Sequence, residues 1–173
     1  SSNIGTLFIA RKIGEEKYKK FIEESKLLET PDLEIEEVGH PINFNWDKCK
    51  LETVSFGHGI TTTPLQATSV YASLVNGGLE IEPSLIKRNK EIEGKRLISK
   101  KTSESIINIL RKVVTEQEGT ASLANVNGYY VGGKTGTSQN YQNKNENLNT
   151  FISIFPSQEP KYALLVMLEN PQV

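Results

Sequence analysis

The sequence predicts a mixed α/β fold of the α+β type, in which helices flank an antiparallel sheet. Three strand-like runs follow one another towards the end of the chain, at 128–137, 148–155 and 162–168. Consecutive strands with short connections favour an antiparallel meander. The last two runs are almost continuously apolar, so at least one face of each should be covered.

Helical periodicity is expected before these strands. Thr63 is the predicted N-cap of one helix, Pro64 suits its first position, and the glycines after Asn76 end it. A later stretch has the clearest pattern, with apolar residues at i, i+3, i+4, i+7 and i+8. Between the helices we expect loops, apart from a short strand-like piece at 79–87. The expected helices are 4–13, 15–27, 64–75 and 101–115.

Composition and charge exclude several functional classes. The chain has 173 residues and a net charge of −1, so nothing suggests a nucleic-acid-binding footprint. Cys49 is the single cysteine, which rules out an intrachain disulfide and a cysteine-based metal site. His40 and His58 are too few for a zinc site made of histidines alone, and no cofactor is expected. No run approaches the ~18 apolar residues of a membrane span.

Residues 128–135 match the phosphate-loop pattern of Gly, four residues, Gly, Lys and Thr. A phosphate loop needs a flexible backbone after a strand and a helix that starts at the lysine. Here Tyr129, Tyr130 and Val131 favour a strand. No apolar helical period follows Lys134, so the nucleotide-binding interpretation is disfavoured.

The alternative keeps Lys134-Thr-Gly-Thr137 on a strand. Alternation then sends Lys134 and Gly136 to one face and Thr135 and Thr137 to the other. Such an edge suits a peptide carboxylate and a developing oxyanion, and Gly136 lets a ligand approach the backbone. Taken alone, the motif also fits a surface strand with small polar residues. Ser1-Ser-Asn3 alone equally fits a helix N-cap.

Together and in this order, Ser-x-Asn at Ser1 and Lys-Thr-Gly at Lys134 resemble two of the three motifs of penicillin-recognising serine acyltransferases. Further segments of the chain sharpen the resemblance to class B penicillin-binding proteins. The chain resembles the septal cell-division type (penicillin-binding protein 3) first and the elongation type second. The segments that carry the resemblance are Gly57–Gln66, Tyr71–Gly78, Gly119–Ala121 and Gly128–Thr137.

The resemblance implies a role for each matching residue. Ser1 would relay protons between the lysine base and the leaving amine, and Asn3 would bind the peptide amide of a D-Ala-D-Ala stem peptide. Lys134 would supply positive potential. Thr135 and Thr137, with Gly136 between them, would bind the terminal carboxylate, and the Thr137 N–H would be one oxyanion donor. The family's nucleophile, in a Ser-x-x-Lys motif upstream of Ser-x-Asn, has no counterpart here in a matching helical context.

The resemblance further implies that residues 1–173 are the C-terminal portion of one transpeptidase domain of the transpeptidase/β-lactamase-like architecture, incomplete without its nucleophile-bearing part. The parent would be anchored in the inner membrane and face the periplasm. It would act on peptidoglycan stem peptides, bind β-lactams and work with division or elongation proteins. Part of the apolar sheet should then be uncovered, which would leave the isolated segment marginal or sticky. A β-lactamase-like hydrolase, a β-lactam sensor and a catalytically silent binding module remain as alternatives.

Overall fold

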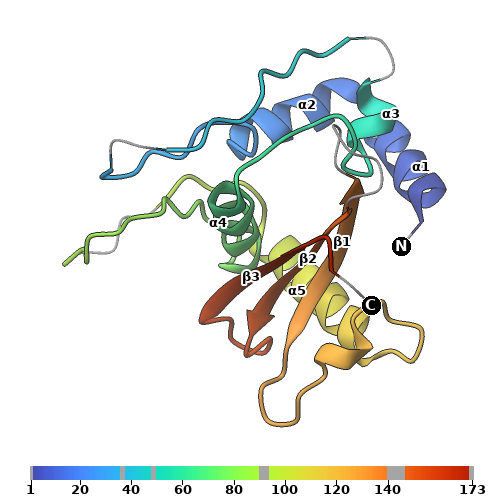
Figure 1. Ribbon diagram of the computed structural model, residues 1–173, viewed down its shortest axis with the longest axis vertical. Coiled ribbons are helices and arrows are strands. Elements are labelled where there is room, and N and C mark those ends of the chain that lie inside the picture. Colours follow the sequence, from blue (N-terminus) through green and yellow to red (C-terminus); the bar gives the residue numbers. More distant parts are fainter. Residues whose placement is uncertain (1, 36–37, 48–49, 90–93, 140–146, 172–173) are drawn as a thin grey trace. The chain divides into compact units, whose positions relative to one another are not determined.

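The computed structural model describes residues 2–35, 38–47, 50–89, 94–139 and 147–171. They form two compact units (Figure 1). The first unit consists of residues 1–70 and 80–97, and the second of residues 71–79 and 98–173.

Local sequence signals explain the helices of the first unit. These are α1 (Asn3–Ile13), α2 (Glu15–Glu24) and the first part of α4 (Pro64–Val75), together with a short α3 (Lys50–Val54) that the sequence did not predict. Ser2 is the N-cap of α1, and its Oγ accepts a hydrogen bond of 3.1 Å from the Gly5 N–H. The second helix ends three residues earlier than expected, because Lys26 adopts a positive φ of 55°.

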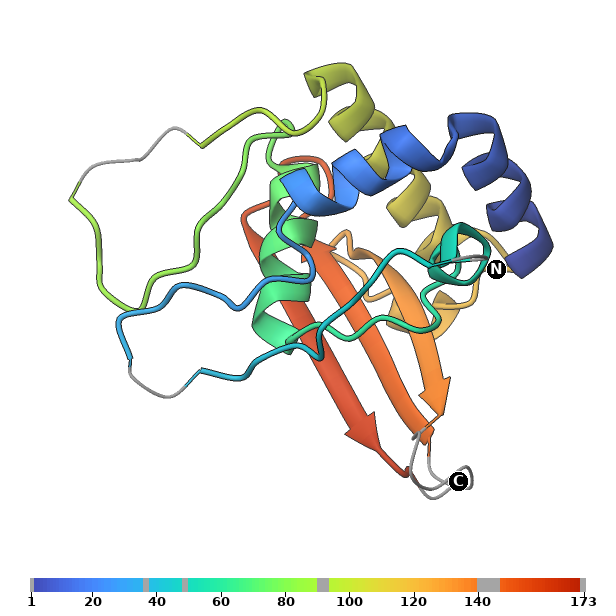
Figure 2. The ribbon, with the colours of Figure 1, turned by 90° about the horizontal axis from the view of Figure 1, so that it is seen from above.

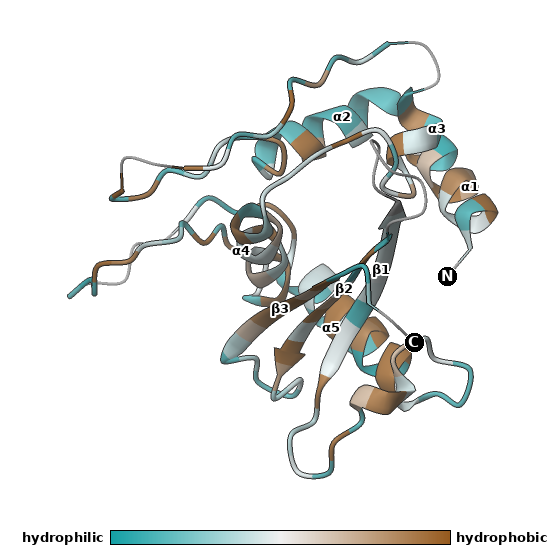
Figure 3. Cartoon of the chain, viewed as in Figure 1, coloured by the Kyte–Doolittle hydropathy of each residue, from teal (hydrophilic) through white to brown (hydrophobic). Residues whose placement is uncertain are grey.

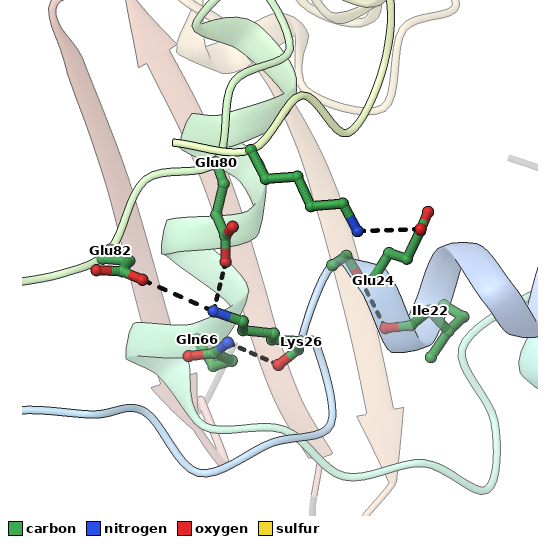
Figure 4. Close-up of polar contacts among 8 residues, drawn as sticks. Ile22, Glu24, Lys26, Gln66, Glu80 and Glu82 are labelled. Atoms are coloured by element: carbon green, nitrogen blue, oxygen red, sulfur yellow. Dashed lines mark hydrogen bonds and ion pairs between the residues drawn. The ribbon is translucent and has the colours of Figure 1, made fainter. Parts of the chain in front are cut away.

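Lys26 ties several segments of the first unit together (Figure 4). Its Nζ forms an ion pair of 2.7 Å with the Glu80 carboxylate, and this contact raises the pKa of Lys26. The Lys26 carbonyl accepts a 2.6 Å hydrogen bond from Gln66 Nε2. A second ion pair of 3.0 Å joins Lys95 to Glu24. These contacts hold both ends of residues 80–97 to the C-terminal end of α2.

The strand expected at 79–87 does not form. Leu79 makes only an isolated bridge, and the Glu80 N–H donates to the Lys95 carbonyl at 2.8 Å. No ladder continues through the described residues that follow. A side chain occupies part of the hydrogen-bonding capacity that a strand would use. The Glu34 carboxylate accepts hydrogen bonds from the hydroxyl of Ser84 and from the Leu85 N–H.

The second unit contains the sheet. Its strands are β1 (Gly132–Gln139), β2 (Asn147–Phe155) and β3 (Tyr162–Glu169), in the order β1-β2-β3 (Figure 2). Both pairs are antiparallel, which confirms the expected meander. The helical elements of the unit are the end of α4 (Pro64–Val75), then α5 (Lys100–Thr115) and the short η1 (Ser122–Ala124).

One face of the sheet is covered. Val75 of α4, Leu110 of α5 and Ile154 of β2 form the buried cluster, and Ile154 is fully inaccessible. Burial also raises the pKa of Tyr71, which packs against this cluster. The helix with the clearest pattern is present as predicted. Ile109, the i+3 position of that apolar pattern, is 61% exposed, so its expected burial was wrong. The buried stripe of α5 runs instead through Ser103, Leu110 and Val114.

The other face of the sheet carries exposed apolar side chains. Leu164, Val166 and Leu168 alternate along β3 and are 43–54% exposed. Figure 3 shows the apolar character of β2 and β3 beside the paler β1. The expected uncovered apolar surface is therefore present on the sheet. Exposed apolar rows of this kind are sites of association.

Candidate active site

The Lys134–Thr137 segment lies on β1, in the middle of an extended strand. No helix begins at Lys134, so the structure contradicts the phosphate-loop interpretation. The strand starts at Gly132 rather than at the expected Gly128, because Gly128 and Tyr130 both have positive φ angles, of 87° and 51°. β1 is an edge strand of the described sheet, so its outer edge has no strand partner there.

The register assigns the side chains of the motif to opposite faces. Gly132 pairs with Ile154 of the core, and Lys134 pairs with Ile152 two residues along, so both lie on the covered face. Thr135 and Thr137 lie together on the opposite face. This arrangement confirms the alternation expected from the sequence and places two hydroxyls on one side of the strand.

Lys134 carries a positive charge at this edge. Its Nζ donates a 2.6 Å hydrogen bond to the carbonyl of Thr135, the next residue. Among the ion pairs of the described residues, none involves Lys134. The ammonium is half-buried, and a positive charge without a paired carboxylate favours an anion nearby.

Two glycines of β1 lie in close contact with β2, and the contact at Gly133 is with backbone. A Cβ on Gly133 would lie 2.6 Å from the carbonyl oxygen of Ile152 and 2.7 Å from the Phe151 ring. A Cβ on Gly136 would lie 2.7 Å from Thr150 Oγ1, which donates to the Gly136 carbonyl at 3.3 Å. The sequence explains Gly136 by ligand approach, and the only close contact there among the described residues is with the Thr150 hydroxyl, a side-chain atom that can rotate away.

Arg111 and Thr120 support β1 through hydrogen bonds. The sequence did not assign either residue to the site. Arg111 of α5 donates from Nη1 to the Val131 carbonyl at 2.6 Å, just before the strand begins. Thr135 donates from its hydroxyl to Thr120 Oγ1 at 2.9 Å. The signal for Thr120 in the sequence is that Gly119–Ala121 belongs to the segments that carry the resemblance, which assigns no role to Thr120 itself.

The Ser-x-Asn end of the expected site belongs to the first unit. Ser1 lies outside the described residues, and Asn3 is the first residue of α1. The Lys134–Thr137 edge belongs to the second unit, and the structure describes each unit by itself. The convergence of the two motifs therefore stays a prediction. The sequence also predicts a polar loop at 138–147 that borders the cleft, and most of it, residues 140–146, lies outside the described residues.

Ser84-Leu-Ile-Lys87 has the Ser-x-x-Lys spacing, but the sequence predicts no helix there. These residues are not helical. The hydroxyl of Ser84 donates to the Glu34 carboxylate and accepts from the Ile86 N–H at 3.1 Å. The Glu34 carboxylate has a lowered pKa because of these contacts with Ser84 and the Leu85 N–H. Ser84 therefore has a structural role in a turn, and the spacing does not mark a nucleophile.

The described residues contain no group of three His, Cys, Asp or Glu side chains that could hold a metal ion. No helix within the same ranges has the length and apolar character needed to cross a bilayer.

Comparison with known proteins decides the family. A model of the penicillin-binding protein transpeptidase domain matches residues 1–172. The chain belongs to this family. The probable peptidoglycan D,D-transpeptidase FtsI of Caulobacter vibrioides is 32% identical over 99% of the chain. The stage V sporulation protein D of Bacillus subtilis is 30% identical over the same share. The predicted resemblance to class B enzymes of the cell-division type is confirmed.

Solved structures agree with the assignment. Penicillin-binding protein 3 of Mycobacterium tuberculosis, complexed with aztreonam, is 27% identical, and its TM-score is 0.87 over 98% of the chain. The transpeptidase domain of Burkholderia pseudomallei penicillin-binding protein 3 has a TM-score of 0.91 at 24% identity, which supports the fold alone. The chain spans 43% and 54% of these two structures and about a third of the curated relatives, 32% and 29%. The predicted α+β transpeptidase fold is confirmed.

Proposed function

We propose that residues 1–173 are the C-terminal portion of a peptidoglycan D,D-transpeptidase domain, whose parent cross-links D-Ala-D-Ala stem peptides through a serine acyl-enzyme. The observation that carries the proposal is the Lys134–Thr137 edge. It combines an ammonium that has no carboxylate partner among the described residues, two hydroxyls on one face and a bare backbone at Gly136 on an edge strand. The family membership supports the reaction class.

The chemistry follows from these groups. An extended peptide can lie along the exposed edge of β1 as an added strand. Its terminal carboxylate would accept hydrogen bonds from Thr135 and Thr137 in the field of Lys134. The Thr137 N–H would then donate to the oxyanion that forms when the nucleophile attacks the scissile carbonyl. A donor placed where charge develops stabilises the transition state more than the ground state.

The remaining steps use the Ser-x-Asn motif and a serine outside this chain. That serine would attack the carbonyl of the penultimate D-Ala, form an ester and expel the terminal D-Ala. Ser1 would pass the proton to the leaving amine, and Asn3 would bind the peptide amide. An amine of a second stem peptide would then attack the ester and release the serine. We place the parent at the inner membrane, facing the periplasm, with division or elongation proteins as partners.

Covalent labelling tests the proposed function. The full-length parent, incubated with fluorescent penicillin, is expected to carry a label that survives denaturation, because a β-lactam acylates the same serine. Residues 1–173 alone are expected to remain unlabelled. An unlabelled parent would favour the catalytically silent binding module. Rapid loss of the label by hydrolysis would favour the β-lactamase-like enzyme over the transpeptidase.

A further inference from the structure

The hydroxyl of Thr135 is already engaged in the structure. It donates to Thr120 Oγ1 at 2.9 Å. A threonine hydroxyl has one proton to donate and two lone pairs that accept. With its proton directed at Thr120, Thr135 cannot donate to a carboxylate at the same time. The proposed carboxylate site therefore needs this pair to change its direction.

Thr120 is held in place by the turn that ends α5. The Gly119 N–H donates to the Glu116 carbonyl at 2.9 Å, and the Ala121 N–H donates to the Val113 carbonyl at 3.3 Å. Ala121 is 6% exposed, so the turn is anchored on its C-terminal side. A Cβ on Gly119 would overlap the Val113 carbonyl, so only glycine permits this close approach. The hydroxyl of Thr120 is thus presented to β1 by a fixed backbone.

We propose that Thr120 is a positioning residue for the carboxylate-binding hydroxyl of Thr135. Ligand binding would reverse the hydrogen bond between the two residues, so that the Thr120 side chain adjusts to become the donor and Thr135 Oγ1 the acceptor. The Thr135 proton then points away from Thr120 and is free for the ligand carboxylate. In this chain of two hydrogen bonds, the first polarises the hydroxyl that makes the second. The inference rests on the proposed function and adds a residue outside the Ser-x-Asn and Lys-Thr-Gly motifs.

The local exposure agrees with such a role. Thr135 is half-buried and Thr120 is exposed, so a ligand at the β1 edge can reach the pair. Thr137 lies on the same face as Thr135 and has no second threonine bonded to it among the described contacts. Thr135 is therefore the hydroxyl of the motif whose direction a neighbouring side chain can set.

The test compares acylation of the full-length parent by fluorescent penicillin in four variants. Thr120→Val removes the hydroxyl at nearly constant shape, Thr120→Ser retains it, and Thr135→Val removes its partner. Ser122→Ala changes an exposed hydroxyl in the same turn and is the matched control. Thr120→Val is expected to lower the second-order acylation rate constant by about 3- to 10-fold, the range that one net hydrogen bond supplies. Thr120→Ser and Ser122→Ala should stay within about twofold of the wild type.

A double-mutant cycle separates positioning from general stability. If Thr120 acts through Thr135, Thr120→Val should have no further effect on the acylation rate in the Thr135→Val background. The thermal midpoint should be the same in Thr120→Val and Thr120→Ser. The inference about Thr120 would be overturned if Thr120→Val and the wild type had equal acylation rates, or if the rate losses of the two single variants multiplied in the double variant. Either result would leave the proposed function standing. A wild-type parent that does not label at all would overturn the proposed function, and the inference with it.

Discussion

Replacing Lys134 by methionine in the full-length parent is expected to lower the acylation rate constant for penicillin by about 100-fold or more, the loss typical of removing one preorganised electrostatic group. Methionine retains the length and apolar stem of the side chain, but it removes the ammonium that donates to the Thr135 carbonyl. Both the attraction of the ligand carboxylate and the positive potential at the strand edge disappear. Stopped-flow or gel-based labelling at several penicillin concentrations measures the effect.

The matched control is Lys161→Met, which removes an exposed lysine from the same unit at the turn between β2 and β3. It should leave the acylation rate within about twofold, because long-range effects of an exposed charge are screened by salt. The thermal midpoint of each variant shows whether the domain remains folded. Equal losses in the two variants would mean that Lys134 contributes only to net charge, and the proposed site would be wrong.

A methyl group added at Gly133 is expected to destabilise the domain by about 3 kcal/mol, at the upper end of the usual cost of overpacking. The reason is steric, because the added Cβ would lie 2.6 Å from a backbone oxygen, that of Ile152, which cannot move without disturbing the β1–β2 ladder. In Gly133→Ala, the thermal midpoint of the transpeptidase domain should fall by roughly 5–10 °C. Differential scanning fluorimetry on the full-length parent measures it.

Gly39→Ala provides the comparison for this prediction. A Cβ on Gly39 would meet its nearest neighbour, a methyl group of Thr63, at an ordinary contact distance of 3.6 Å. This variant should change stability by no more than about 0.5 kcal/mol, as for most substitutions away from close contacts. If Gly133→Ala had the same thermal midpoint as the wild type, Gly133 would not lie as close to the Ile152 carbonyl of β2 as the structure shows.

Apart from the short α3, the α-helices and the order of the strands could be predicted from local patterns. The caps at Ser2 and Thr63 satisfy backbone N–H groups within three residues, so sequence alone contains the signal. The end of α2 could not be predicted in the same way. It depends on a positive φ at Lys26, a residue without intrinsic preference for that conformation, and on tertiary contacts with Glu80 and Gln66. The strand expected at 79–87 does not form for the same reason. A side chain distant in sequence, that of Glu34, accepts the hydrogen bond of one of its backbone N–H groups.

The site was predictable where it rests on alternation along a single strand. Period-two patterning alone places Thr135 and Thr137 on one face. The hydrogen bonds that Arg111 and Thr120 make to this segment could not be predicted from strand alternation, because they depend on the packing of α5 against β1. Likewise, the spacing of Ser84 and Lys87 looks like a catalytic motif in sequence and proves to be a turn held by Glu34. Whether a short motif is functional therefore depends on the secondary-structure element in which it lies.

The most direct test of the central claim is a crystal structure of the full-length parent acylated by benzylpenicillin. The account predicts that the ligand carboxylate lies within about 3 Å of the Thr135 and Thr137 hydroxyls, with Asn3 lining the same cleft. A carboxylate bound elsewhere, or Asn3 and the Lys134–Thr137 edge on opposite sides of the molecule, would contradict it.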